Sequence, residues 1–500
     1  MLKYLRQLAS ESLVYGLAGT VSRFITIFLV PLYTRVLTPA DYGVMSLIRN
    51  ATTLFAALAS LSLDTATQRF YWDKKDEADR KSVFACWTWT WLGLTLVGAF
   101  LLAIFADIFA LKVVGRDDAS RPLRLAAFTM PLNVLGVIYI NRLRILRRPW
   151  AVMRFAIITS LMTIILSALF VLVLRWGIEG VFLSSFLVSL GTTLVVSTYI
   201  REWIHPGYFD WKELKAMLQF SVPLIPVLVS WWAIDVIDRY FLQAYTTTAQ
   251  VGLYEIGYSI AAAVALGTMA FQQAWTPFAL SLQDKPEARD IYASALVAYT
   301  FVGCIACVGA TLFAPEVLRL LTTNAYYGAS SVVACLAFSY FLTGSGYIAT
   351  IGLAITKQTI SMGTAAVAGA TVNIALNFLL IPRYGKDGAA VSTLIAFAVV
   401  QVYLFYRAQQ AYPVPYRFGT CLIIILFAAA MIRIGYSTTF ESAWLTILIK
   451  TGLLTLFLPL PLLLRVVTLT DLQTFSRRIF ASVTAKAESS SVPSHVVGPE

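Results

Sequence analysis

The segment RVLTPADYGVMSLIRNATTLFAALASLSL, residues 35–63, joins a helix start to an apolar run long enough to cross a membrane. Thr38 and Asp41 have the spacing of a capping box, and Pro39 suits the first turn of a helix. Arg49 follows, about two turns into the apolar run. The segment therefore predicts a membrane-spanning helix that carries a fixed positive charge.

The composition of the whole chain agrees with that prediction. Of its 500 residues, 59% are hydrophobic and only 13% are charged, and the mean hydropathy is +0.75. Soluble globular proteins have about a quarter of their residues charged. We therefore expect an all-α polytopic membrane protein. The net charge is +12, and in a membrane protein Lys and Arg concentrate in the cytoplasmic loops. We therefore do not take this charge as a sign of a nucleic-acid partner.

Apolar segments of membrane length recur along the chain, and they predict about 14 spans. These spans are 12–32, 42–64, 83–106, 122–141, 153–174, 179–200, 217–236, 251–273, 291–313, 330–351, 360–381, 387–406, 419–435 and 444–464. The side that bears the N-terminus carries about twice as many Lys and Arg residues as the other side, which predicts that both termini are cytoplasmic. The polar residues 471–500 are predicted to be a disordered tail.

Two pairs of segments indicate an internal repeat. LRWGIEGVFLSS (174–185) aligns with PRYGKDGAAVST (382–393), and LTPADYGVMSL (37–47) aligns with TTTAQVGLYEI (246–256). The glycines that pair in these alignments are Gly177 with Gly385, Gly180 with Gly388, and Gly43 with Gly252. We interpret them as positions of tight turns or close backbone approach at helix starts.

The period of the repeat holds six spans. Because six is even, both copies have the same orientation, and parallel repeats are related by an axis along the membrane normal. This predicts a six-helix N-lobe at 1–208 and a six-helix C-lobe at 209–410, which face each other across a cleft. Two extra helices at 411–470 and the tail at 471–500 complete the predicted chain.

Two arginines within the first two spans are candidate cavity residues. An arginine at the centre of a membrane helix costs about 2.5–3.5 kcal/mol on insertion scales, so such residues usually face a cavity or a partner. Arg23 and Arg49 each lie on a face of small and polar residues, which predicts that they point into a lumen. Snorkelling to the outer interface is an alternative for Arg49, whereas Arg23 is too central for it.

Further charged residues are candidates for ion coupling or gating: Asp64, Asp235, Asp238, Arg239 and Glu255. Each has a structural alternative. Asp64 would cap the inner end of its helix or pair with Arg69. The group at 235–239 would form an ion cluster at the membrane interface. Glu255 would be stabilised by the helix dipole near a helix N-terminus.

No catalytic or cofactor-binding motif is found in the sequence. The chain has five cysteines and two histidines but no cluster with metal-ligand spacing, and it has no P-loop, GxSxG or HExxH motif. Asn373 and Asn377 share a helical face and are expected to bond neighbouring helices. We expect neither an enzyme nor a bound metal or cofactor.

The motifs PLYTRVLTPADYG (31–43), WGIEG (176–180) and YGKDG (384–388) resemble the polysaccharide-export branch of the multidrug/oligosaccharidyl-lipid/polysaccharide exporter superfamily. The resemblance implies a flippase of the O-antigen type. Such a protein moves a polyprenyl-diphosphate-linked oligosaccharide of the O-antigen, capsule or exopolysaccharide kind across the bacterial inner membrane by alternating access. The implied partners are this lipid-linked oligosaccharide, membrane lipids, a glycan polymerase or chain-length protein, and a coupling H⁺ or Na⁺.

The resemblance also assigns roles to residues. Related flippases carry cationic residues in the cavity of the first lobe, and Arg23 and Arg49 match them by position as diphosphate-binding residues. The two extra helices match those that form a groove for the lipid tail. An ion-coupled small-molecule or multidrug antiporter on the same fold is the alternative, and it would require acidic residues in the cavity. A glycan polymerase or ligase, or a scaffold without transport, would be further rivals.

Overall fold

The computed structural model describes residues 29–358, 360–437, 443–457 and 459–460. Over these residues the chain is built from helices joined by short loops, and no strand occurs among them. Eleven of the described helices are long and apolar enough to cross a membrane. The predicted first span and the tail lie outside the described residues, except for the end of the first span.

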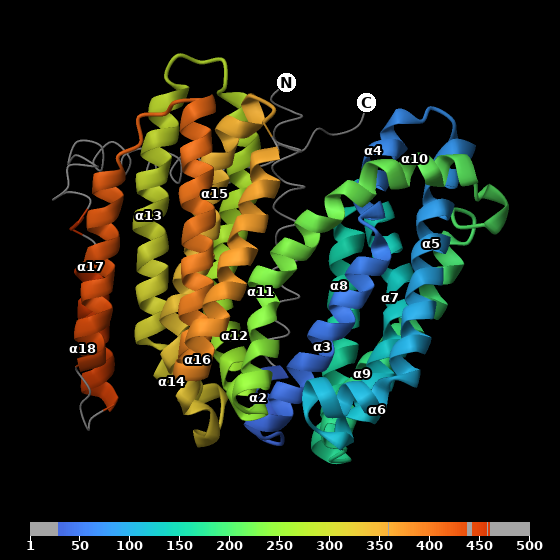
Figure 1. Cartoon of the computed structure of the whole chain (residues 1–500), viewed down its shortest axis with the longest axis horizontal. Helices are drawn as coiled ribbons and strands as arrows, with labels where there is room; N and C mark the ends of the chain where they lie inside the picture. The colour runs from blue at the N-terminus through green and yellow to red at the C-terminus, as the bar shows by residue number, and fades with distance from the viewer. Residues whose placement is uncertain (1–28, 359, 438–442, 458, 461–500) are drawn as a thin grey trace, which may run out of the picture.

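The first lobe comprises the helices from α2 to α9 (Figure 1). These are α2 (Leu29–Thr34), α3 (Pro39–Ser60), α4 (Leu63–Asp73), α5 (Glu77–Ile104), α6 (Ala106–Phe109), α7 (Ser120–Ile145), α8 (Pro149–Ser167) and α9 (Gly177–Ile200). The predicted capping box starts α3, because the Thr38 hydroxyl accepts the amide N–H of Asp41 at 3.2 Å and the Asp41 carboxylate accepts the amide N–H of Thr38 at 3.0 Å.

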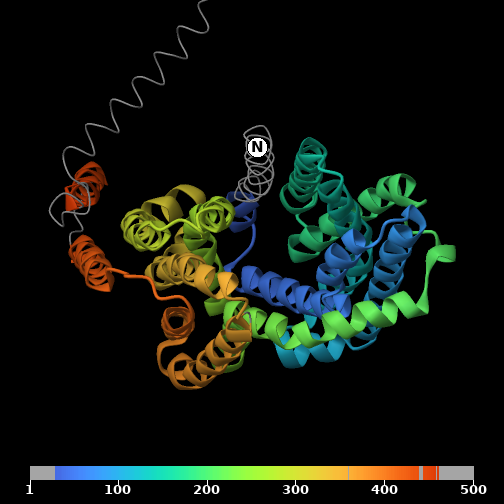
Figure 2. The same cartoon turned by 90° about the horizontal axis from the view of Figure 1, so that it is seen from above.

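The second lobe and the remaining helices follow in the order α11 (Ile225–Tyr245), α12 (Thr248–Ser281), α13 (Ala288–Leu312), α14 (Ala314–Leu321), α15 (Ser330–Ile355), α16 (Ile360–Ala411), α17 (Phe418–Ser437) and α18 (Ala443–Thr455). The long α16 contains both the eleventh and the twelfth predicted spans, and it is kinked at Gly385 between them. The helices α17 and α18 stand beside α13, outside the second lobe (Figure 2).

The internal repeat is visible in the backbone. Gly177 and Gly385, which pair in the sequence alignment, have φ of 56° and 54°, a left-handed conformation that favours glycine. Thr38 caps α3 and Thr247 caps α12, each through a hydroxyl that accepts an amide N–H three residues later. The predicted all-α fold, with two lobes related by a parallel repeat, is confirmed.

The lobes meet where α3 and α12 begin, at the lower end of the molecule in Figure 1. At this lower end the amide of Gln243 donates to the carbonyl of Val114 at 2.7 Å. The hydroxyl of Tyr326 donates to the carbonyl of Leu37 at 2.8 Å. Toward the upper end, where α4 and α10 lie, the ribbons of the two lobes diverge (Figure 1).

Two paired glycines bring α3 and α12 into close contact at the lower end. A Cβ atom placed on Gly43 would lie 3.1 Å from the backbone nitrogen of Gly252, and one placed on Gly252 would lie 3.0 Å from that of Gly43. Gly43 also faces the carbonyl of Thr248, while Gly252 faces the carbonyl of Pro39. The contact is therefore reciprocal, as expected for two copies of a repeat around a two-fold axis.

One short helix, α10 (Trp211–Ser221), links the lobes at the upper end. It packs on α4 and α5 of the first lobe, where the Lys74 ammonium lies 2.6 Å from the Glu213 carboxylate. After α10 the chain passes through Val222–Leu224 directly into α11 of the second lobe. Seen from above, the segment from α10 to α11 crosses from one lobe to the other (Figure 2).

Candidate functional site

A cavity of about 490 Å³ lies between the lobes. Its walls come from α2 and α3 of the first lobe and from α11, α12 and α15 of the second. Its polar lining residues are Tyr33, Tyr42, Arg49, Asp235, Glu255, Tyr258, Ser259, Thr268, Tyr340, Thr343 and Tyr347. Mostly apolar pockets with a few convergent polar groups are the usual form of a ligand site.

Arg49 lies on the first-lobe side of this cavity. It is on α3, ten residues after Pro39 and therefore about 15 Å along the helix. The side chain is exposed, and its guanidinium forms no hydrogen bond or ion pair with any residue that the structure describes. Arg49 thus presents a cation to the cavity. Arg23, the other predicted diphosphate-binding residue, lies outside the described residues.

Arg239, by contrast, is a buried and neutralised cation. Only 2% of it is exposed. Its Nη1 lies 2.9 Å from Oδ1 of Asp238 and its Nε lies 3.2 Å from Oε2 of Glu255. Nη1 also donates to the backbone carbonyl of Asp235. A buried charge has to be paired in this way, because removing it from water costs several kcal/mol.

The carboxylates around Arg239 have partners of their own. Asp238 accepts hydrogen bonds from the hydroxyls of Tyr254 and Thr393, the latter at 3.1 Å. Asp235 accepts one from the hydroxyl of Tyr258 at 2.9 Å. The Tyr258 ring also lies 4.3 Å from the Arg239 guanidinium, a cation–π distance. Three carboxyl groups and one guanidinium therefore share this cluster.

Glu255 connects this cluster to the first lobe. Its Oε2 accepts a hydrogen bond from the Ser46 hydroxyl of α3 at 3.1 Å, and Ser46 in turn accepts one from the Asn50 amide at 3.1 Å. Glu255 therefore bonds to both lobes within two turns of the start of α12.

The seventh predicted span ended too early, and this changes the setting of the acidic residues. The span was predicted to end at 236, but α11 continues to Tyr245. Asp235, Asp238 and Arg239 consequently lie inside a helix, six to ten residues before its end. Asp238 and Arg239 are buried in the second lobe, while Asp235 lines the cavity between the lobes.

Asp64 stands apart from the cavity. It is exposed in the first turn of α4, just after the chain turns at Leu61 and Ser62, which have positive φ of 48° and 55°. It forms no ion pair with Arg69 among the described residues, and the Arg69 guanidinium instead lies 4.8 Å from the Phe220 ring. The structure therefore does not bring Asp64 together with the other candidates.

The paired glycines lie at the ends of the lobes and do not line the cavity. Gly43 and Gly252 form the lower-end contact, while Gly177 and Gly385 turn the chain at the start of α9 and within α16. Gly180 packs on the backbone of Phe170, and Gly388 packs in the same way on the backbone of Leu380.

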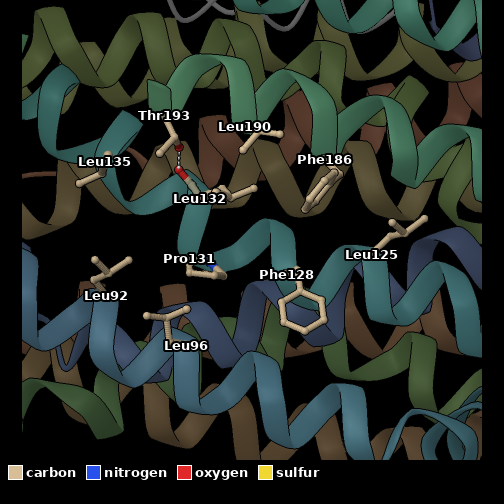
Figure 3. A pocket seen from close by; sticks show the side chains of 10 residues that line it. All are labelled: Leu92, Leu96, Leu125, Phe128, Pro131, Leu132, Leu135, Phe186, Leu190 and Thr193. Atoms are coloured by element: carbon tan, nitrogen blue, oxygen red, sulfur yellow. Dashed lines mark hydrogen bonds between the residues drawn. The ribbon is translucent and has the colours of Figure 1, made fainter. Parts of the chain in front are cut away.

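A second cavity, of about 390 Å³, lies inside the first lobe between α5, α7 and α9 (Figure 3). Its lining is leucine and phenylalanine with Pro131 and Thr193, and the Thr193 hydroxyl donates to the carbonyl of Leu132 at 2.6 Å. This cavity offers no charge to a ligand, so the polar cavity between the lobes is the candidate site.

Sequence reasoning missed the tyrosines of the polar cavity. Tyr340, Thr343 and Tyr347 recur at helical spacing on one face of α15, and this pattern was the available signal. It is weak because aromatic residues are frequent in this chain, at 13%. The Lys450 ammonium lies 2.6 Å from the Glu316 carboxylate and joins α18 to α14.

Two helical lobes related by a parallel repeat around a polar cavity are the arrangement of a class of membrane transporters. The chain belongs to the family described as polysaccharide biosynthesis protein, whose model matches residues 8–283. The resemblance to the polysaccharide branch is thereby confirmed.

Two curated relatives come from the archaeon Haloferax volcanii. The chain is 25% identical over 249 residues to the probable flippase AglR, a match of 47% of this chain and 48% of the relative. It is 22% identical over 353 residues to the probable low-salt glycan biosynthesis flippase Agl15, a match of 68% of this chain and 69% of the relative. The chain thus matches about half the length of the first relative.

Solved structures share the fold. The lipid II flippase MurJ in an inward closed conformation has a TM-score of 0.70 at 16% identity. The match covers 90% of this chain and 99% of the MurJ chain. An inward-facing multidrug resistance MATE family transporter has a TM-score of 0.63 at 15% identity. The match covers 77% of this chain and 94% of the transporter chain.

Proposed function

We propose that the protein is a flippase that moves a polyprenyl-diphosphate-linked oligosaccharide, such as an O-antigen, capsule or exopolysaccharide repeat unit, across the membrane by alternating access. The observation that carries the proposal is the Arg49 guanidinium, which lines the cavity between the lobes without an acidic partner among the described residues. Both curated relatives are named as probable flippases.

The chemistry of such a substrate suits this cavity. A diphosphate is strongly hydrated, and a fixed cation offsets part of the cost of removing it from bulk water. At a separation of 4 Å and an effective dielectric constant of 20, one pair of unit charges gains about 4 kcal/mol. The apolar polyprenol needs no such site, because it remains in the bilayer. Arg23 is proposed as a second diphosphate-binding residue.

A small-molecule or multidrug antiporter is the alternative, and one observation favours it: Asp235 and Glu255 both line the cavity. Both carboxylates, however, already have partners within the protein. Asp235 accepts a hydrogen bond from Tyr258, and Glu255 accepts one from Ser46 and forms an ion pair with Arg239. A free cation and occupied carboxylates support an anionic substrate more than a cationic one.

The orientation and surroundings of the protein follow from the same proposal. The lower end, where the lobes touch, would face the outside, and the upper end would face the cytoplasm with both termini, as the distribution of Lys and Arg favours. We place the protein in the plasma membrane, which is the inner membrane of a Gram-negative bacterium. It would act as a transporter, supplied by glycosyltransferases and followed by a polymerase, with H⁺ or Na⁺ as candidate coupling ions.

Substitution of Arg49 tests the proposal. Hydrogen bonds to charged groups contribute about 1.5–3 kcal/mol, so Arg49→Ala should slow translocation by about 10–150-fold, and Arg49→Lys should retain part of the rate. The measurement is the appearance of a fluorescent prenyl-diphosphate disaccharide in the opposite leaflet of proteoliposomes.

Arg154→Ala provides the matched control, since Arg154 is exposed on α8 and does not line the cavity. Its rate should equal that of the wild type. Equal rates for Arg49→Ala and the wild type, at equal amounts of reconstituted protein, would remove the physical basis of the proposal.

A further inference from the structure

The second-lobe wall of the cavity has a distinct chemistry. It is formed by α12 and α15 of the second lobe, and it presents Tyr258, Tyr340 and Tyr347, which are partly exposed. We call these three residues the tyrosine wall. Tyr33 and Tyr42, which also border the cavity, are only 4% and 5% exposed and offer little ring surface to a ligand.

The tyrosine wall runs along the length of the cavity. The rings of Tyr258 and Tyr340 lie 5.6 Å apart. Tyr347 follows Tyr340 by seven residues on α15, which places it about 10 Å further along the helix. Thr343 lies between them on the same face and also lines the cavity. The wall therefore has the length to contact more than one unit of an extended ligand.

Two residues of the wall are hydrogen-bonded to neighbouring side chains, Tyr258 through its hydroxyl and Tyr347 through its backbone. The Tyr258 hydroxyl donates to Asp235, and the indole N–H of Trp275 donates to the backbone carbonyl of Tyr347 at 3.2 Å. The Tyr347 hydroxyl forms no hydrogen bond with any described residue, so both its ring and its polar tip are available to a ligand. A tyrosine offers a rigid apolar surface with a hydrogen-bonding end.

Sugars match that combination, because a pyranose ring has an apolar face of C–H groups and a rim of hydroxyls. A lipid tail would use the apolar surface but leave the hydroxyl of Tyr347 without a partner, whereas the Thr343 hydroxyl already donates to the carbonyl of Ser339 at 3.1 Å. A diphosphate would find no cation on this wall, since the buried Arg239 is already paired with carboxylates. The wall therefore suits the glycan part of a lipid-linked oligosaccharide.

Charge narrows the class of sugar further. Asp235 and Glu255 border the tyrosine wall, and with Asp238 they make three carboxyl groups around the single guanidinium of Arg239. This excess of acid disfavours a sugar that carries its own carboxylate. An uncharged sugar, by contrast, donates hydroxyls to carboxylate and tyrosine oxygens without repulsion.

We infer that the tyrosine wall is the glycan-binding subsite of the cavity, that it selects uncharged over acidic sugars, and that Tyr347 contacts the sugar directly. This inference rests on the proposed flippase function. In the resulting arrangement Arg49 holds the diphosphate on the first lobe, while the tyrosine wall holds the glycan on the second. The substrate would bridge the two lobes.

Binding to the purified full-length protein in nanodiscs tests the inference. The probes are a short-chain polyprenyl diphosphate that is bare, that bears one N-acetylglucosamine, or that bears one glucuronic acid. The wild type should bind the N-acetylglucosamine probe more tightly than the other two. Tyr347→Ala should weaken binding of that probe about tenfold, which corresponds to 1.4 kcal/mol, and should leave the bare probe unaffected.

Two further variants complete the test. Tyr347→Phe keeps the ring and should show a smaller loss of affinity for the N-acetylglucosamine probe. This variant also replaces Tyr347→Ala in the test if Tyr347→Ala fails to fold. Tyr406→Ala is the matched control, because Tyr406 is 61% exposed on α16 and does not line this cavity.

The outcomes separate the inference from the proposed function. If Arg49→Ala weakens all three probes while the Tyr347 variants bind like the wild type, the flippase proposal stands and the tyrosine wall is not the glycan subsite. Tighter binding of the glucuronic acid probe would overturn the selection for uncharged sugars. If none of the probes binds the wild type, the proposed function itself fails.

Discussion

The reciprocal contact of Gly43 and Gly252 leads to a prediction about the conformational equilibrium of the protein. A Cβ atom added at Gly252 would lie 2.8 Å from the carbonyl carbon of Pro39 and 3.0 Å from the nitrogen of Gly43. Carbon atoms in contact prefer separations of about 3.5–4.0 Å. The carbonyl oxygen of Pro39 would lie closer still, so Gly252→Ala requires α3 and α12 to move apart by more than about 1 Å at the point where the lobes meet.

The substitution should weaken closure of the lower end without unfolding either lobe. Overpacking a close contact costs about 1–3 kcal/mol. The cost applies only while the lobes touch, so it shifts the ratio of closed to open forms by about 5–150-fold. Since the opposite face of each helix is unchanged, the unfolding temperature should move little compared with the wild type.

Spin-label distance measurements across the lower end would report the shift. Suitable label positions are Lys112, on the first-lobe segment Ala110–Val114, and Arg319 on α14, both exposed. We expect a population at longer distance in Gly252→Ala and the wild-type distribution in the control Gly98→Ala, where an added Cβ meets nothing within 4 Å. Identical distributions in wild type and Gly252→Ala would refute the reasoning.

Two further substitutions follow from the buried cluster and from the kink in α16. Arg239→Ala leaves Asp238 and Glu255 without their shared cation and should destabilise the protein by about 3–5 kcal/mol, measured as a lower unfolding temperature in detergent; an unchanged temperature would contradict the pairing. Gly385→Ala imposes a side chain at φ 54° and should cost about 1–2 kcal/mol, whereas Gly93→Ala, a control with open space around it, should not lower the unfolding temperature.

Most of the fold could be predicted from the sequence because membrane length and turn chemistry act locally. The apolar runs located the spans, and the repeated glycine motifs indicated two lobes in parallel orientation. The short helices α4 and α10 were not predicted, since they lie along polar segments that resemble loops. Residues 360–381 and 387–406 were predicted as separate spans, and the break in helical geometry at Gly385 lies between them.

The candidate site was only partly predictable. The position of Arg49 inside an apolar helix marked it as unusual, and it lines the cavity. Which carboxylate pairs with Arg239 depends on contacts between α11 and α12, and the bond from Ser46 to Glu255 joins residues 209 positions apart in the chain. No spacing rule within one helix predicts such contacts, because they arise from packing between helices.

The link from α10 to α11 has a mechanical consequence. Its first part is fixed to the first lobe by Glu213 and Lys74, and its last part carries Asp235 into the second lobe. The turn between them holds Pro223 and Pro226, which lack the amide hydrogens that stiffen a helix. Rocking of one lobe against the other should therefore pivot at this turn. Asp235 lies nine residues beyond Pro226, a lever arm of about 14 Å. A pivot of about 15° would swing Asp235 by about 3–4 Å, which is longer than a hydrogen bond.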